Sequence, residues 1–237
     1  PKTHKLDLNA YREHSIKRFD NNFYTPFKTD LIKLNSKNIS KDIPIIGMYG
    51  KCGSTKGSWD IINALKKLKS EGKKFQFVYL TGGSKKILKD FYSFIFEQKE
   101  LDSIWVLPFL PYWKVPSFIK SCDIMMFLEH DFPIKFHSPS IPYEIISIGK
   151  CLVVSKEIVD KSILKQYLID EKNCVIVDNP NVTKQLAERI EYALIERNHK
   201  NLGGHGLSIS RFVQNGQEHI HPIVTLINGI KKDAHNV

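Results

Sequence analysis

Short, continuously apolar segments alternate with helix-like segments along most of the chain, and this alternation constrains the fold more than any other feature. The apolar segments cover residues 45–49, 75–80, 104–107, 123–128, 151–154 and 174–177. Between the first two, residues 56–70 have helical periodicity, with Trp59, Ile62, Leu65 and Leu68 on one face. Strands that are apolar throughout are typical of parallel sheets buried on both faces. The pattern therefore predicts an α/β fold with a doubly wound parallel sheet of about six strands.

The same pattern predicts the domain organisation. Further helices are expected over 85–98, 115–120, within 138–149, and over 159–168, 182–197 and 208–231. Residues 1–42 are polar and basic, and we interpret them as a linker or N-terminal extension before a single domain over 43–237. Because the first residue is Pro1, we expect the chain to be a piece of a longer polypeptide.

The charge of the chain favours anionic partners. The 35 Lys and Arg residues outnumber the 25 Asp and Glu residues, which gives a net charge of +10. A solvated, lysine-rich surface is the simpler interpretation, and the sequence has neither an arginine-rich stripe nor an aromatic RNA-binding signature. We therefore expect no nucleic-acid partner, whereas a peripheral contact with a membrane surface stays open. No apolar run approaches the roughly 20 residues that span a bilayer, so we expect a cytoplasmic protein.

The four cysteines indicate a reduced, metal-free domain. Cys52, Cys122, Cys151 and Cys174 are far apart in the sequence, and three of them lie in or beside apolar segments. This distribution is typical of buried free thiols in a cytosolic protein rather than of disulfides or a zinc site. We expect neither a metal site nor a tightly bound cofactor.

The segment 50–57 combines glycines with two lysines between a strand and a helix. Glycines let a backbone approach a phosphate, and Lys51 and Lys56 each offer an ammonium to a diphosphate. The spacing matches neither a Walker A motif nor G-x-G-x-x-G, so a plain strand-to-helix turn is an equal alternative. Gly82 and Gly83 follow the next strand, and they indicate either a turn or a flat surface for a ligand.

The segment 138–149 places one carboxylate, Glu144, in the expected first turn of a short helix that ends at a glycine. A carboxylate at this edge of a sheet can accept hydrogen bonds from ribose hydroxyls. The alternative is an acid that complements the helix dipole. His130 and His137 lie on the preceding loop, where they either contact a ligand or are solvated, and Asp123 is expected to make a structural hydrogen bond.

Taken together, these segments resemble the C-terminal, Rossmann-like, donor-binding domain of GT-B glycosyltransferases, in particular the large group 1 family of mostly retaining enzymes. The first two matching segments are the apolar strand with Gly50-Lys51 and Lys56-Gly57, and the strand that ends in Thr81-Gly82-Gly83. The third runs from Trp105 through Val115-Pro116 to Asp123-Ile-Met-Met, and the fourth is Ser138-Pro-Ser-Ile-Pro-Tyr-Glu144 with Gly149-Lys-Cys-Leu-Val-Val-Ser155. The resemblance extends over about residues 43–230.

The resemblance implies the roles of the site residues. Gly50, Lys51 and Lys56 would hold the donor diphosphate, and Glu144 would bind the ribose. Backbone groups near Ser138, Pro139 and Ser140 would meet the phosphate or sugar. The loop 105–109, with Val106 and Leu107, would contact the base, and Gly82 and Gly83 would belong to the donor-binding residues. No catalytic residue is assigned.

The chain departs from the family pattern at three positions. Phe136 stands where the first acid of the Glu-x7-Glu pattern is usual, Ile141 replaces a lysine, and Phe109 replaces a glycine of the base loop. These positions concern recognition of the sugar and the pyrophosphate, and not the fold. The family also has a preceding acceptor domain, which residues 1–42 are too short to build.

The resemblance implies a nucleotide-sugar donor domain, from a glycosyltransferase that transfers a hexose-type sugar to a glycan, a lipid-linked or a protein acceptor. The nucleotide sugar would be a donor substrate rather than a cofactor. The alternative is a degenerate, non-catalytic partner domain that kept the fold, which Phe136 and Ile141 favour. A membrane or nucleic-acid adaptor ranks last.

Overall fold

The structure, a computed structural model, describes residues 40, 42–98, 101 and 103–215. Its strands are β1 Ile45–Lys51, β2 Gln76–Gly82, β3 Ile104–Pro108, β4 Ile124–Phe127, β5 Cys151–Ser155 and β6 Val175–Val177. They form one six-stranded sheet in the order β3-β2-β1-β4-β5-β6, and every neighbouring pair is parallel. The predicted α/β fold with a doubly wound, Rossmann-like parallel sheet is confirmed.

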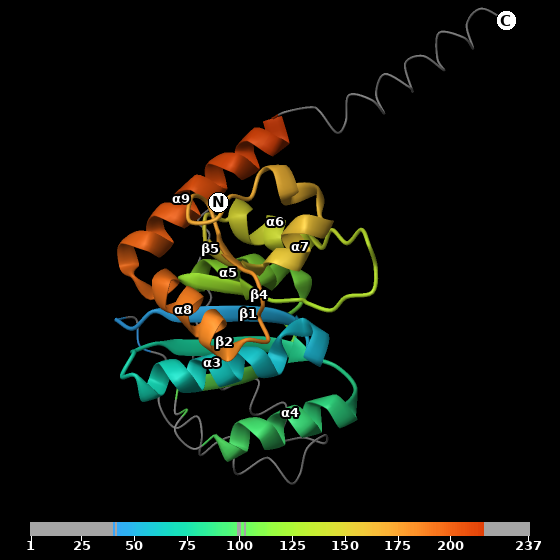
Figure 1. Ribbon diagram of the computed structural model, residues 1–237, viewed down its shortest axis with the longest axis vertical. Coiled ribbons are helices and arrows are strands. Elements are labelled where there is room, and N and C mark those ends of the chain that lie inside the picture. The colour runs from blue at the N-terminus through green and yellow to red at the C-terminus, as the bar shows by residue number, and fades with distance from the viewer. Residues whose placement is uncertain (1–39, 41, 99–100, 102, 216–237) are drawn as a thin grey trace, which may run out of the picture.

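Helices follow the strands in the predicted alternation (Figure 1). They are α3 Ser58–Ser70, α4 Lys85–Glu97, α5 Val115–Ser121, α6 Ser140–Ser147, α7 Lys156–Lys161, α8 Thr183–Leu194 and α9 Glu196–Asn215, with short 3-10 turns η1 Ser54–Lys56, η2 Tyr112–Lys114 and η3 Ile163–Gln166. Within the described chain, no helix has both the length and the apolarity needed to cross a membrane.

The sheet is covered on both faces, as its apolar strands predict. One hydrophobic cluster joins the sheet to α3, α4 and α8 through Leu65, Phe91 and Ile190. The other joins it to α5 and α6 through Phe118 and Ile145, and to α7. Figure 1 shows the long helix α9 passing beside α6 and β5, against which it packs. Because helices cover both faces of the sheet, only the ends of its strands are accessible. Ligands therefore bind beyond the carboxyl ends of the strands, the edge that we call the rim.

The structure corrects the bounds of three predicted helices. The helix expected over 159–168 starts earlier, at Lys156, directly after β5, and it ends because Ser162 is extended (φ −103°, ψ 163°) and caps η3. The two C-terminal helices also have other bounds. The extended backbone of Ile195 (φ −66°, ψ 119°) separates α8 from α9, which begins at Glu196 rather than near 208. Residues 216–231 of the last predicted helix, and most of the predicted linker 1–42, lie outside the described residues.

The chain reverses its direction of winding between β1 and β4, which are neighbours in the sheet. Two loops therefore lie side by side at the carboxyl ends of these strands, and Gly57 packs closely against Leu128. Gly57 has φ +72°, and a Cβ there would lie 2.6 Å from Leu128 Cβ and 2.9 Å from Leu128 O. Open α/β sheets bind ligands at such a reversal point.

Candidate functional site

A cavity of about 260 Å³ lies at the carboxyl ends of β1 and β4. Its lining comes from four segments: the end of β1, η1, the end of β4 with the loop that follows, and α6. The lining residues are Met48, Tyr49, Gly50, Lys51, Lys56, Phe127, Glu129 and Ile141. Three predicted site residues, Gly50, Lys51 and Lys56, are thus brought together in one cavity.

The two cavity lysines differ in their surroundings. Lys51 is exposed at the end of β1, and among the described residues no carboxylate forms an ion pair with it. The ammonium of Lys56 instead contacts Glu129, and it lies 4.7 Å from the centroid of the Phe132 ring. The cavity therefore contains one lysine without a counter-ion among the described residues and one whose charge is already balanced.

Glu129 is the residue that sequence reasoning missed. It is the second residue after β4, its side chain is only 9% exposed, and its Oε1 accepts from Lys56. Its Oε2 lies 2.7 Å from Nε2 of His137, whose ring stacks on Phe132 with centroids 4.2 Å apart. The sequence does contain a pattern that could have indicated Glu129: a carboxylate directly after an apolar strand, at the end of the sheet where ligands bind.

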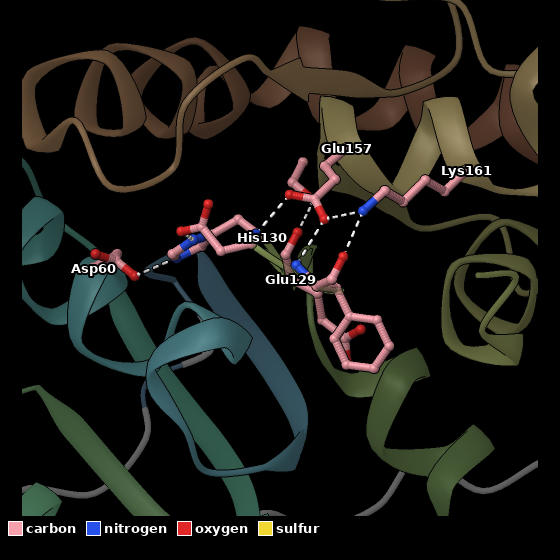
Figure 2. A network of polar contacts seen from close by, with 8 residues as sticks. Asp60, Glu129, His130, Glu157 and Lys161 are labelled. Carbon is pink, nitrogen blue, oxygen red and sulfur yellow. Dashed lines mark hydrogen bonds and ion pairs between the residues drawn. The ribbon is translucent and has the colours of Figure 1, made fainter. Parts of the chain in front are cut away.

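His130 attaches the same loop to helix α3. Its Nε2 lies 2.9 Å from Asp60 Oδ2 and its Nδ1 lies 2.8 Å from Asp131 Oδ2 (Figure 2). Burial disfavours the charged imidazole, but the hydrogen bonds and charges of Asp60 and Asp131 outweigh burial and raise the pKa of His130. Both histidines considered as ligand contacts are therefore engaged with carboxylates of the chain itself.

Glu157 and Lys161 of α7 attach the loop on its other side, as Figure 2 shows. Glu157 accepts hydrogen bonds from the backbone N–H groups of Asp131 (2.6 Å) and Phe132 (2.8 Å). Lys161 donates to Glu157 and to the carbonyl oxygen of Phe132, both at 2.6 Å. The loop after β4 is thus held between α3 and α7, which fixes Glu129 at the cavity wall.

Glu144 lies next to the cavity and is joined to it by Tyr49. The phenol of Tyr49 donates to Oε2 of Glu144 at 2.6 Å, and the hydroxyl of Ser140 donates to Oε1 at 2.6 Å. Burial of Tyr49, together with the adjacent carboxylate, raises the pKa of the phenol. Because α6 begins at Ser140, Glu144 is its fifth residue and lies in the second turn, not in the predicted first turn.

Ser138 and Pro139 lead into this helix without lining the cavity. The Ser138 hydroxyl accepts a hydrogen bond from the backbone N–H of Ile163 at 3.4 Å, and Pro139 is the extended N-cap residue of α6 (φ −66°). Asp123 has the structural role expected of it, since its carboxylate accepts from the backbone N–H of Ile45 at 2.9 Å. All four cysteines are buried free thiols, as predicted.

Val106 and Leu107, expected near the base, and the glycines Gly82 and Gly83 lie toward the β3 edge of the sheet, away from β4. Gly82 is covered by the ring of Phe109, because a Cβ on Gly82 would lie 2.5 Å from Phe109 Cε2. A Cβ on Gly83 would lie 3.7 Å from Cys52 O. Val106 and Leu107 of β3 are buried in the core, one on each face of the sheet, and β2 separates them from β1. The base contacts of Val106 and Leu107 stay a prediction. At Gly82, the ring of Phe109 covers the flat surface that the sequence offered to a ligand.

The chain was compared with known proteins. The family model described as "Glycosyl transferases group 1" matches residues 32–203. No curated protein sequence matches the chain.

Several solved structures share the fold at low sequence identity. The C-terminal domain of the group 1 glycosyl transferase LpcC from Francisella tularensis has a TM-score of 0.59 and 16% identity, over 71% of this chain and 86% of that one. Anabaena HepE in complex with UDP has a TM-score of 0.64 and 16% identity, over 83% of this chain and 53% of that one. Sucrose-phosphate synthase from Thermosynechococcus elongatus has a TM-score of 0.63 and 15% identity, over 83% of this chain and 49% of that one.

The chain therefore spans nearly all of one isolated C-terminal domain and about half the length of the larger enzymes. The match of the family model to most of the chain agrees with the parallel sheet and with the cavity at its reversal point. This chain belongs to the glycosyl transferases of group 1.

Proposed function

We propose that this chain is the donor-binding half of a glycosyltransferase, and that it binds a nucleotide diphosphate sugar in the cavity between β1 and β4. The observation that carries the proposal is the meeting of Lys51, Lys56 and the Tyr49–Glu144 pair at one point of the rim. Anabaena HepE, which has a similar fold, was solved in complex with UDP and with UDP-glucose. A ligand of this class has the negative charge that the cavity lysines would neutralise.

The residues take separate roles in this proposal. Lys51 and Lys56 hold the diphosphate, and their positive charge stabilises the negative charge that develops there as the bond from sugar to phosphate breaks. Glu144, oriented by Tyr49 and Ser140, accepts hydrogen bonds from the ribose. The sugar is of the hexose type, and the acceptor is a glycan, a lipid-linked or a protein group. A preceding N-terminal domain supplies the acceptor contacts.

Isothermal titration of the chain with UDP-, GDP- and ADP-sugars tests the proposal. At least one class of donor should bind, and Lys51→Ala and Glu144→Ala should each weaken its binding about tenfold or more, as expected for lost charge-assisted hydrogen bonds. Lys86→Ala is the matched control, because Lys86 is exposed on α4 and outside the cavity. Absence of binding by every donor, or equal binding by all variants, would reject the site.

The degenerate, non-catalytic domain remains the second candidate, because Ile141 lines the cavity where a lysine is usual in the family. In the longer polypeptide, a donor-binding enzyme should lose sugar transfer on Lys56→Ala. A degenerate domain should leave the transfer rate unchanged.

A peripheral membrane contact is a separate proposal. Tyr112 is 82% exposed and Trp113 is 64% exposed, their ring centroids are 5.3 Å apart, and the exposed Lys114 follows them. Aromatic rings beside lysines suit the interface of an anionic bilayer. In sedimentation with anionic vesicles at about 0.15 M salt, the chain should pellet with the vesicles. The variant with Tyr112→Ser and Trp113→Ser should stay in the supernatant. Equal sedimentation of both chains would reject this surface.

A further inference from the structure

Glu129 places a fixed negative charge in the wall of a cavity whose proposed ligand is an anion. Its side chain is 9% exposed, and one of its oxygens contacts the ammonium of Lys56. The other oxygen is 2.7 Å from His137 Nε2. None of these contacts would be predicted for a site that simply maximised its attraction for a diphosphate.

The position of Glu129 is fixed by several independent contacts. The hydroxyl of Ser155 donates to its carbonyl oxygen, and the backbone N–H of His130 donates to Thr55 O at 3.0 Å. The Phe132 ring contacts both partners of the carboxylate, Lys56 and His137. A carboxylate held in this way cannot turn away when a ligand enters, so its charge acts on any anion that reaches Lys56.

We propose that Glu129 sets the affinity of the cavity for the diphosphate, because it positions Lys56 at the cavity and at the same time offsets its charge. Lys51, which has no ion-pair partner among the described residues, then supplies the charge that attracts the anion. The diphosphate left after sugar transfer is bound loosely enough to leave. The inference deepens the proposed function, on which it rests for the identity of the ligand.

The two effects of Glu129 can be separated by substitution. Glu129→Gln keeps the size of the side chain and an oxygen that can accept from Lys56, but it removes the negative charge. Glu129→Asp keeps the charge. If charge is the property that matters, the affinity for anions rises in Glu129→Gln and stays within about threefold of the wild-type value in Glu129→Asp. A merely structural role predicts the opposite ranking. Glu129→Gln would then keep the contact with Lys56 and bind like the wild type, whereas the shorter side chain of Glu129→Asp would loosen Lys56 and weaken binding.

The experiment is isothermal titration of the 237-residue chain with inorganic pyrophosphate and with UDP-glucose, at low and at physiological salt. Glu129→Gln should bind both probes about tenfold more tightly than the wild type, with a steeper loss of affinity as salt rises. Glu97→Gln is the matched control. It removes an exposed carboxylate at the end of α4 that does not line the cavity, and its affinity for both probes should equal that of the wild type.

A second pair of variants covers the case in which Glu129→Gln alone fails to fold. Lys56→Met leaves Glu129 without its cation, and the double variant Lys56→Met with Glu129→Gln removes both charges together. The double variant should bind pyrophosphate more tightly than Lys56→Met. Equal or weaker binding would overturn the inference, as would unchanged or weaker binding by a folded Glu129→Gln.

The outcomes distinguish this inference from the proposed function. If UDP-glucose binds to the wild type and to Glu129→Gln equally, Glu129 does not set the affinity, while the donor site stands. If Glu129→Gln tightens pyrophosphate binding but no variant binds any nucleotide sugar, the charge effect stands and the proposed donor is wrong. If no variant binds either probe, both are rejected.

Discussion

The phenol of Tyr49 donates a 2.6 Å hydrogen bond to Glu144, and this contact joins the end of β1 to helix α6. Tyr49 lines the cavity, and Glu144 lies next to it without being a lining residue. A tyrosine phenol has an ordinary pKa of about 10 and is protonated at neutral pH. Burial and the adjacent carboxylate raise the pKa of Tyr49 further, so its phenol is a hydrogen-bond donor there. The carboxylate is thereby held in one orientation before any ligand arrives.

Tyr49→Phe should therefore lower donor affinity without unfolding the chain. Loss of one hydrogen bond to a charged group costs about 1.5–3 kcal/mol, and we expect the lower end because Ser140 still holds Glu144. Titration calorimetry gives the affinity and thermal unfolding gives the stability. An affinity equal to that of the wild type would mean that the orientation of Glu144 does not matter for binding.

The two cavity lysines should differ in their effect on stability. Lys56→Ala leaves the buried carboxylate of Glu129 without its cation, which should cost about 3 kcal/mol. Lys51→Ala removes an exposed ammonium without an ion-pair partner among the described residues, so unfolding should change by less than about 0.5 kcal/mol. Urea denaturation of both variants measures the difference. Equal destabilisation would contradict the pairing of Lys56 with Glu129.

Gly57→Ala should strongly destabilise the site. The left-handed backbone (φ +72°) is unfavourable for alanine, and the new Cβ would lie 2.9 Å from the carbonyl oxygen of Leu128. Since backbone of both loops would have to shift, we expect a loss of about 2 kcal/mol or more. Gly72→Ala is the matched control, because Gly72 has φ +76° but nothing lies within 4 Å of its added Cβ. A similar loss in both variants would assign the cost to backbone strain alone.

The contribution of His130 should depend on pH. Its folded-state pKa is raised, so its stabilising effect is fully present below the unfolded pKa of about 6.5 and is lost as the pH rises through the folded-state pKa. Asp60→Asn removes the partner on α3 and should destabilise the chain more at pH 5.5 than at pH 8. Denaturation at both pH values measures the difference. A loss independent of pH would show that the charge of His130 does not contribute.

The fold followed from local pattern. Each strand is a continuous apolar segment, and each helix has an apolar stripe, so neighbouring residues specify the elements and both buried faces of the sheet. The helix bounds that the sequence predicted wrongly lie at Ser162 and Ile195. Neither residue is a glycine or a proline, yet the extended backbone of each ends a helix. Their conformation depends on packing against elements distant in the sequence.

By itself, the sequence determined the order of the elements, the position of the rim and the two lysines of the cavity. Only the tertiary structure decided which groups meet there: Lys56 with Glu129 across 73 residues, Tyr49 with Glu144 across 95, and Phe109 on Gly82. The physical reason is that periodicity records which face of an element is buried. Contacts between side chains at the ends of strands depend instead on the order of the strands and the path of each loop, which no local pattern specifies.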